Sequence, residues 1–539
     1  MTETQPDFVR ALQQAAAYPH AVEGISLLET HISWVFLTGA YVYKIKKPVS
    51  MGFLDFTDLA SRRYYCRQEI ELNRRLTRKV YKRVVPLTRA EDAIRLDGDG
   101  PVIEYAVQMK QLSRDDSLEV MLTERALDDT RLNRLAEILA RFYEEAAAGP
   151  EIDAAGSRAA IAENCRDNFD QLAAAADDII DHRRLAVIRA ATDGFLENHA
   201  DRFDERVQQG RIRDGHGDLR TDHIYFTDTG IQIIDCIEFN PRFRYGDVAS
   251  DLAFLAMEMD ARGYPRQSGQ LLSNVIRHSG DQQLFSLLDF YKCYRAMVRA
   301  KVNYLRRQQA DVTAAEAEQL AAQIRNYLGL AYRYAVQFSR PVLWVVFGLI
   351  ATGKSTVGRA VSEALGIRLI RSDVVRKELL ADTFRQTGVG RFGEGMYTPA
   401  ATALTYGTLL LRAQEELEQG RSVVLDATFS RQEDRQEALR LAKEAGALII
   451  FVQCRCREEI IRQRLEARAG SDSVSDARVQ HLARLQAVFE PPAELSPHCL
   501  VSVDTEQPLE ESLRAIFTYT ATPNDCLERD WLAPAGSGR

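Results

Sequence analysis

The chain has 539 residues, of which 46% are hydrophobic and 27% are charged, and its formal net charge at pH 7 is −8. This length exceeds what one hydrophobic core supports, so we expect about two to four domains. The negative charge argues against a broad nucleic-acid-binding surface. The lack of a long apolar run argues against a membrane span, and eight cysteines over this length argue against a disulfide framework. We therefore expect a cytoplasmic protein.

The strand and helix patterns change in character along the chain. In the first part, β runs are expected at 31–37, 41–45 and 102–109, with helical segments at about 59–76, 115–210 and 250–335. In the second part, β runs alternate with helices, at 343–347, 367–370, 422–425, 448–453 and 499–503. This alternation predicts a parallel sheet wrapped by helices. Because Pro341 follows the last long helix, we predict domains at 1–338 (a small lobe at about 1–110, a helical lobe at about 111–338) and 339–520, and a flexible tail at 521–539.

Two lysines in the first part lie on one face of a predicted strand. Lys44 and Lys46 are two residues apart in Tyr-Val-Tyr-Lys-Ile-Lys, and side chains two apart in a strand point to the same side. Glu69 and Glu71 lie on the next predicted helix. A basic edge strand that resists association is one explanation of this pattern.

A dense polar motif follows at 213–226. It contains Asp218 and His223, and a predicted strand hairpin after it ends in Asp235. Phosphoryl transfer needs one carboxylate to orient the acceptor hydroxyl and others to hold Mg²⁺. This segment supplies such a set.

The pattern His-Gly-Asp-x-x-x-x-His followed by Ile-Asp resembles the catalytic loop of the aminoglycoside phosphotransferase and protein-kinase-like superfamily. The resemblance implies a two-lobed fold in which Asp218 is the catalytic aspartate and Asp235 the principal metal ligand. It also implies that Lys44, paired with Glu69, contacts the phosphates. The chain departs from the family at His223, where an asparagine normally binds the second Mg²⁺. Because imidazole is a poor ligand for a hard cation, this departure argues against chemistry with two Mg²⁺ ions. A glycine-rich loop before the lysine is also missing, so this half is a weak or unusual kinase or a nucleotide sensor.

The second part begins with an apolar run, 343–347, that leads into Gly-x-x-x-x-Gly-Lys-Ser. The glycines allow backbone N–H groups to contact phosphate oxygens, and the helix that follows adds its positive N-terminal end. Lys354 is expected to reach the β- and γ-phosphates and Ser355 to bind Mg²⁺. The predicted nucleotide-binding loop comprises Gly348, Leu349, Ile350, Ala351, Thr352, Gly353, Lys354, Ser355 and Thr356.

Two predicted strands of the second part end in carboxylates, at the sheet edge where ligands bind in open α/β folds. Asp373 is expected to accept the proton of an acceptor hydroxyl, and Arg376, one helical turn on, to hold an anionic group of the acceptor. Alternatively, Ser372 and Asp373 only cap the next helix. Asp426 ends the other strand and is expected to bind Mg²⁺.

Arginines are concentrated at 455–468. Arg464 and Arg468 are four residues apart and share a helix face, where they are expected to neutralise transition-state charge as part of a mobile lid. A solvated helix face is the alternative. Cys454 and Cys456, with no further Cys or His nearby, indicate packing rather than a metal site.

Over about residues 341–505 these motifs resemble the P-loop kinase group that contains polynucleotide kinase, gluconate kinase and chloramphenicol phosphotransferase. The resemblance implies that Asp373 is the acceptor-activating base and that Arg464 and Arg468 belong to the lid. Taken whole, the chain resembles fused bacterial proteins that join an aminoglycoside phosphotransferase-like domain to a P-loop kinase domain of the AAA-family ATPases.

We therefore expect an ATP- and Mg²⁺-dependent phosphotransferase that acts on a small hydroxylated or anionic acceptor. One alternative is an ATP-binding and ATP-hydrolysing regulator whose N-terminal half is a pseudokinase. Another is a nucleic-acid 5′-end kinase, which the acidic net charge disfavours. No membrane partner is expected.

Overall fold

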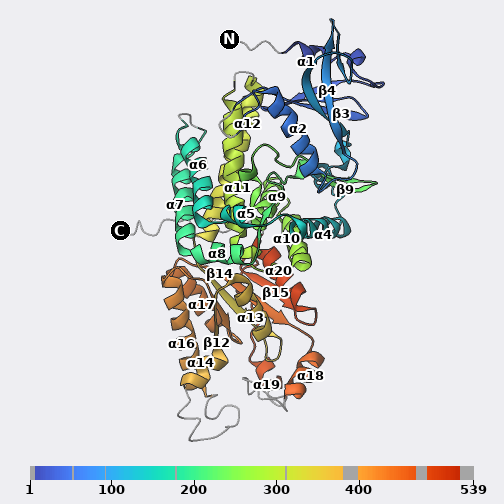
Figure 1. Ribbon diagram of the computed structural model, residues 1–539. Coiled ribbons are helices and arrows are strands. Elements are labelled where there is room, and N and C mark those ends of the chain that lie inside the picture. Colours follow the sequence, from blue (N-terminus) through green and yellow to red (C-terminus); the bar gives the residue numbers. More distant parts are fainter. Residues whose placement is uncertain are drawn as a thin grey trace. The chain divides into compact units, whose positions relative to one another are not determined.

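The computed structural model describes residues 6–50, 54–91, 93–175, 179–309, 312–379, 398–468 and 482–521. The chain forms two compact units (Figure 1). The first comprises Met1–Arg189, Leu196–Tyr264 and Tyr291–Ala331, and the second comprises Ala190–Phe195, Pro265–Phe290 and Tyr332–Arg539. None of the described helices combines the length and apolar character that a membrane crossing requires.

An antiparallel sheet of six strands forms the first part of the first unit, in the order β1-β2-β3-β6-β4-β5. The strands are β1 (Ser26–Glu29), β2 (Ser33–Leu37), β3 (Tyr41–Lys46), β4 (Tyr81–Ala90), β5 (Ala93–Leu96) and β6 (Val102–Lys110), and α1 (Asp7–Ala11) precedes them. Helix α2 (Leu59–Asn73) packs on β4 and β6. It begins after Asp58, whose side chain accepts a hydrogen bond from the Ser61 N–H at 2.9 Å.

Helices dominate the rest of the first unit. They are α3 (Leu118–Thr123), α4 (Asp129–Glu145), α5 (Pro150–Ala154), α6 (Arg158–Ala173), α7 (His182–Asn198), α8 (Ala200–Gln208), α9 (Val248–Ala261), α11 (Leu284–Arg307) and α12 (Ala314–Phe338), of which α7, α11 and α12 continue into the second unit. Helix α9 is buried along almost its whole length, including the carboxylates of Asp251, Glu258 and Asp260.

Two short strand pairs position the polar loops of this unit. Strand β7 (Ile212–Asp214) pairs with β10 (Tyr245–Asp247), and β8 (Ile224–Thr227) pairs with β9 (Gly230–Ile233). The loop at 215–223 lies between β7 and β8, and Asp235 lies just after β9. The pairings therefore bring both predicted carboxylates of this unit to one region.

The second unit contains a parallel sheet of five strands in the order β12-β13-β11-β14-β15. The strands are β11 (Val342–Phe347), β12 (Arg368–Arg371), β13 (Val423–Asp426), β14 (Leu448–Arg455) and β15 (Leu500–Asp504). The helices are α10 (Pro265–Ser279), α13 (Lys354–Leu365), α14 (Ser372–Leu379), α16 (Pro399–Glu418), α17 (Gln432–Glu444), α18 (Glu458–Arg468), α19 (Leu482–Ala487) and α20 (Leu509–Ala521).

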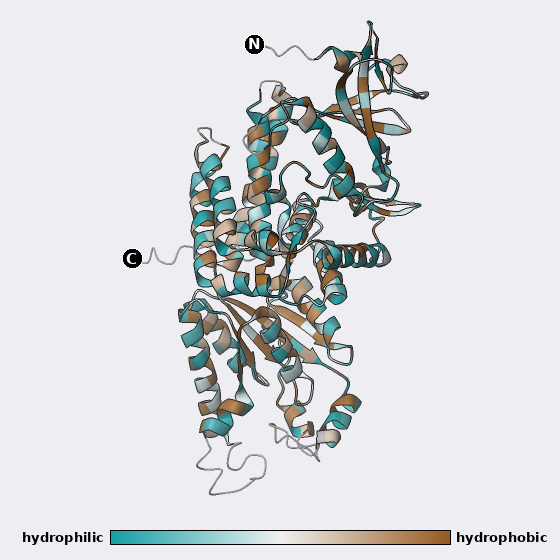
Figure 2. Ribbon diagram, viewed as in Figure 1, coloured by the Kyte–Doolittle hydropathy of each residue, from teal (hydrophilic) through white to brown (hydrophobic). Residues whose placement is uncertain are grey.

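Both faces of this sheet are buried. Successive side chains of β11 enter different hydrophobic clusters, with Val345 and Phe347 in one and Trp344 and Val346 in the other, because side chains alternate between the two faces of a strand. Figure 2 shows these strands as predominantly hydrophobic. Strands that are covered on both faces have continuous apolar sequences, and this pattern allowed the strands of the parallel sheet to be predicted.

The structure confirms the predicted fold class, with a two-lobed α+β part followed by a parallel sheet wrapped by helices. The prediction missed β1, β4 and β5, since residues such as Arg83, Pro86 and Arg89 interrupt the apolar alternation of β4. Helix α10 groups with the second unit, where it packs against α20. Phe285, just after it, stacks on Phe517 with ring centroids 4.4 Å apart.

Candidate functional site

A network of two lysines and three carboxylates connects β3, α2 and the loop after β9, and all of it except Asp235, whose side chain is 42% exposed, is largely buried. The Lys44 Nζ lies 3.0 Å from Glu69 Oε1 and 2.6 Å from Asp235 Oδ1. The Lys46 Nζ lies 2.8 Å from Glu69 Oε2 and also contacts Glu238 Oε1. The structure thus brings Lys44 and Glu69 together, and Glu69 also contacts the second lysine, Lys46. The sequence assigned no role to Lys46 or Glu238.

Burial and the neighbouring charges shift the pKa values of this network in opposite directions. Burial disfavours the Lys44 ammonium, but the carboxylates of Asp235 and Glu69 outweigh it and raise the pKa of Lys44 well above its ordinary value. Burial also disfavours the two carboxylates, yet the lysine charges hold the pKa values of Asp235 and Glu69 below the ordinary range. The network therefore holds Lys44 as a cation and Asp235 as an anion at neutral pH.

The loop at 215–223 is held by Asp251, near the start of α9. The Asp251 carboxylate accepts hydrogen bonds from the N–H groups of His216, at 2.6 Å, and Gly217, at 3.0 Å. Gly217 has a φ of +84°, and a Cβ atom there would lie 2.7 Å from the Phe243 carbonyl oxygen. Only glycine fits this position, which fixes the backbone next to Asp218.

His216 braces the same loop. Its Nε2 donates to the Ile234 carbonyl at 3.0 Å, and its Nδ1 accepts from the Asp218 N–H at 3.3 Å. Burial lowers the pKa of His216 to about 4. Both ring nitrogens are occupied by backbone groups, so this histidine positions the loop.

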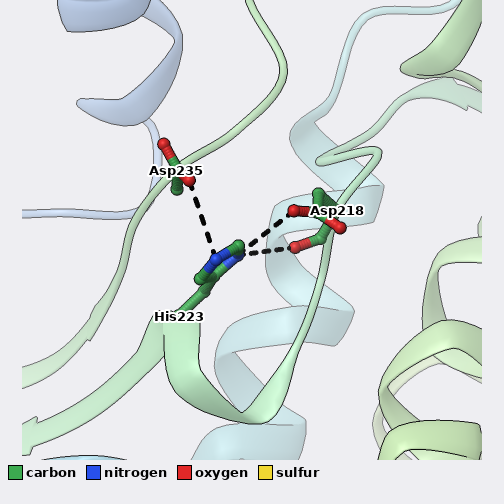
Figure 3. A group of neighbouring side chains, drawn as sticks. All are labelled: Asp218, His223 and Asp235. Carbon is green, nitrogen blue, oxygen red and sulfur yellow. Dashed lines mark hydrogen bonds and ion pairs between the residues drawn. The ribbon is translucent and has the colours of Figure 1, made fainter. Parts of the chain in front are cut away.

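Asp218, His223 and Asp235 face one another (Figure 3). One possible ligand atom from each lies within 4.8 Å of the others, the one such group found in the part of the chain that the structure describes. The His223 Nδ1 donates to the Asp218 carbonyl at 2.9 Å, and its Nε2 lies 3.7 Å from Asp235 Oδ2. Two carboxylates suit a divalent cation, but the imidazole nitrogen departs from the all-oxygen set that Mg²⁺ prefers. The group fits a divalent metal and does not fit a dedicated Mg²⁺ site.

A cavity of about 1380 Å³ opens beside this group within the first unit. Lys44, Asp218, His223 and Asp235 all line it. Ligand pockets typically measure about 300–1,000 Å³, so the cavity is large enough for a nucleotide together with a small second ligand.

The predicted nucleotide-binding loop connects β11 to α13 in the second unit. Gly348 has a φ of +143°, and a Cβ atom there would lie 2.5 Å from the Cys454 carbonyl oxygen. The Lys354 Nζ donates to the Leu349 carbonyl at 2.6 Å, so the lysine spans its own loop. Leu349, Ile350 and Ala351 pack with α18 residues. The geometry is that of a phosphate-binding loop at a helix N-terminus.

An arginine that the sequence did not reveal lies at the predicted metal position of this loop. The Arg371 guanidinium lies 3.2 Å from Asp426 Oδ2 and 3.4 Å from Ser355 Oγ. Arg371 and Asp426 are register partners on neighbouring parallel strands, which places their side chains side by side. The two oxygen groups suit Mg²⁺, and the arginine lies between them.

Asp373 lies near these groups at the start of α14. Burial and the Asp426 charge raise the pKa of Asp373, while Lys354, Arg371 and Arg376 act against the rise. A carboxylate with a raised pKa is a stronger proton acceptor than an ordinary aspartate. Arg376 is buried, and its Nη1 lies 3.4 Å from the Thr402 Oγ1.

The arginine-rich helix α18 places one of its arginines on the nucleotide loop. The Arg464 guanidinium donates to the Ala351 carbonyl at 3.3 Å and to the Thr505 carbonyl at 2.6 Å. Arg457 and Arg462 instead form exposed ion pairs with acidic neighbours, as a solvated helix face does. Arg468 is the last residue of α18, and its side chain is outside the described residues.

Comparisons with known proteins identify a matching domain family and relatives along most of the chain. Residues 343–492 match the family model of an AAA domain. The chain is 33% identical over 495 residues to the uncharacterized protein Rv2004c of Mycobacterium tuberculosis, covering 91% of this chain and 94% of that protein, with the same values for Mb2027c of Mycobacterium bovis.

Solved structures of kinases are also similar. A gluconokinase from Sinorhizobium meliloti is 20% identical, with a TM-score of 0.26, over 36% of this chain and 99% of that one. A choline/ethanolamine kinase family protein from Mesorhizobium loti is 14% identical, with a TM-score of 0.37, over 60% of this chain and 99% of that one.

Proposed function

The chain belongs to the same protein family as the mycobacterial proteins Rv2004c and Mb2027c, and we propose that it is an ATP-dependent phosphotransferase with one nucleotide site in each unit. The unit with the parallel sheet transfers the γ-phosphoryl group of ATP to a small hydroxylated or anionic acceptor. The first unit contains a second, kinase-like site.

The observation that carries this proposal is the placement of Asp373. It lies partly buried at the edge of the parallel sheet, within electrostatic reach of both Lys354 and Asp426. A nucleotide switch needs only the loop and the metal-binding carboxylate, whereas a transferase also needs a group that orients the acceptor. Asp373 supplies that group, and its raised pKa favours proton acceptance from a hydroxyl.

The other side chains of this unit fit the same reaction. Lys354, which spans its loop to Leu349, would contact the β- and γ-phosphates when nucleotide fills the loop. Ser355 and Asp426 would hold Mg²⁺, which supplies neutralisation of phosphate charge when bound. Arg464 already contacts the loop backbone and would stabilise negative charge that develops during transfer.

In the first unit, Asp218 would orient an acceptor hydroxyl and Lys44 would contact phosphates. The cavity wall favours an anionic acceptor, because it carries Arg213, Arg242 and Lys301. Burial lowers the pKa of Lys301, and an anion bound beside it would offset the cost of its buried charge.

The test is ADP release from Mg-ATP, with and without a pooled extract of small metabolites. We compare the wild type with Lys354→Ala and Asp218→Ala. The matched controls are Lys377→Ala and Asp228→Ala, since both side chains are exposed and lie outside the two sites. We expect the extract to stimulate turnover, and Lys354→Ala to abolish the activity of the parallel-sheet unit while the controls change little.

Stimulated activity that is lost only in Asp218→Ala would show that the first unit is also catalytic. Slow turnover that the extract does not change would contradict the transferase and favour a nucleotide-gated regulator. His223, in place of asparagine, supports this alternative. A 5′-end kinase would instead label 5′-hydroxyl oligonucleotides, with binding that weakens steeply with salt.

A further inference from the structure

We propose that the site in the first unit binds a divalent first-row transition-metal ion through the His223 Nε2 and the Asp235 carboxylate, in preference to Mg²⁺. The proposal rests on the proposed function only in that this site would also hold the nucleotide phosphates. Metal binding itself can be measured without nucleotide, acceptor or turnover.

The first step is the position of the ring proton on His223. Its Nδ1 lies 2.9 Å from the Asp218 carbonyl oxygen, and a carbonyl oxygen only accepts hydrogen bonds. The Nδ1 therefore carries a proton, which leaves Nε2 as the ring nitrogen that a metal ion can reach. Histidines that bind metals characteristically donate their other ring N–H to a carbonyl or carboxylate in this way.

The second step is the surroundings of Nε2. The His223 side chain is only 10% exposed, and among the described residues Nε2 makes no hydrogen bond. Its nearest charged neighbours are Asp235 Oδ2 at 3.7 Å and Asp222 Oδ2 at 4.0 Å. Two carboxylates that face one ring nitrogen favour a cation between them, either a proton on Nε2 or a bound metal ion that replaces it.

The third step concerns Asp235, whose two oxygens have separate roles. Oδ1 lies 2.6 Å from the Lys44 Nζ, which leaves Oδ2 directed at His223 (Figure 3). The 3.7 Å between Oδ2 and Nε2 exceeds a hydrogen bond. It suits two ligands that each lie about 2.1 Å from a shared ion.

The donor set determines the class of metal. Mg²⁺ prefers oxygen ligands and gives up bound water reluctantly, whereas transition-metal ions accept imidazole nitrogen readily. His216 is no competitor for the ion, since backbone groups occupy both of its ring nitrogens. With Asp218 in the same group, the site offers one nitrogen and two carboxylates.

The experiment uses Mn²⁺ as the probe, with the full-length chain free of nucleotide and affinity tag. Titration followed by electron paramagnetic resonance measures Mn²⁺ binding, and competition measures Mg²⁺. Pulsed measurements then detect magnetic coupling between Mn²⁺ and a histidine nitrogen. Ser355 and Asp426, assigned to the other nucleotide site, offer only oxygen, so nitrogen coupling excludes that site, and the His223→Asn variant then assigns the coupling to one of the nine histidines. Labelling histidine with ¹⁵N tests the same ligand without any substitution.

We expect nitrogen coupling that changes with the ¹⁵N label, and Mn²⁺ affinity at least about tenfold above that for Mg²⁺. His223→Asn, which offers an amide oxygen, should abolish the coupling and weaken Mn²⁺ binding by about tenfold or more, with a smaller effect on Mg²⁺. The matched control is His182→Asn, an exposed histidine on α7, which should leave both unchanged.

The proposal is overturned if bound Mn²⁺ shows no histidine coupling in the wild type, or if the site prefers Mg²⁺. The wild-type spectra decide this even if a variant fails to fold. Nitrogen coupling without any phosphoryl transfer would leave the metal assignment standing and remove the proposed function. Phosphoryl transfer by this site without nitrogen coupling would leave the proposed function standing and remove the metal assignment.

Discussion

Replacing Glu69 with glutamine should destabilise the small lobe of the first unit. Glu69 is fully buried, and its two oxygens lie 3.0 and 2.8 Å from the ammonium groups of Lys44 and Lys46. At an effective dielectric constant of about 20, each contact is worth about 5 kcal/mol before desolvation is subtracted. Removing one partner of a buried ion pair costs about 3–5 kcal/mol net. Glu69→Gln keeps the shape of the side chain but leaves two buried lysines facing one fewer negative charge.

Hydrogen exchange of the full chain, followed by mass spectrometry, measures this loss locally. Peptides from β3 and α2 should lose protection equivalent to about 3 kcal/mol or more, while peptides from β11 and β13 in the other unit keep theirs. Glu71→Gln is the matched control, since that residue is exposed on the same helix. Equal protection in Glu69→Gln and the control would refute the reasoning, because it would mean that Asp235 and Glu238 alone satisfy both lysines.

Three further changes have expected outcomes. Gly217→Ala should abolish ATP-dependent activity of the first unit, because a Cβ atom would lie 2.7 Å from a carbonyl oxygen, while activity of the other unit persists in the same assay. Arg371→Ala leaves Asp426 without its cation, so we expect melting to become Mg²⁺-dependent, with a loss of about 3 kcal/mol in the absence of Mg²⁺; equal melting with and without Mg²⁺ would contradict this. Burial, with the nearby Glu433 charge, raises the pKa of Asp434 to about 6. The folded chain therefore binds this proton more tightly than the unfolded chain, and that stabilisation is lost as the pH rises through about 6. Because Asp434 is partly exposed, Asp434→Asn should stabilise the protein by only about 1 kcal/mol at pH 7 and by almost nothing below about pH 4, as thermal melts at both pH values will show.

The sequence revealed the parts of the molecule that depend on local pattern. The strands of the parallel sheet are continuous apolar runs, and the glycine-lysine loop has a spacing that its phosphate chemistry requires. Arg371 escaped notice, since its partnership with Asp426 comes from strand register across 55 residues of sequence. Glu238 escaped notice for the same reason, because it meets Lys46 only when the two lobes of the first unit come together.

The candidate metal positions at Asp426 and Asp235 have different neighbouring side chains, and this difference affects which cation each unit binds. At the P-loop the side chain beside the carboxylate is an arginine, which has no lone pair and must be displaced before a metal can reach Asp426. At Asp235, Lys44 occupies one carboxylate oxygen, and the other oxygen faces the His223 Nε2, which can bind a metal ion. A protein cation lies beside the carboxylate in both units, Arg371 at Asp426 and Lys44 at Asp235, but only the first unit adds a histidine nitrogen as a possible ligand. Supplying Mg²⁺ alone should then favour the P-loop site over the first unit, whereas added Mn²⁺ should favour the first unit, which separates the two activities within one intact chain.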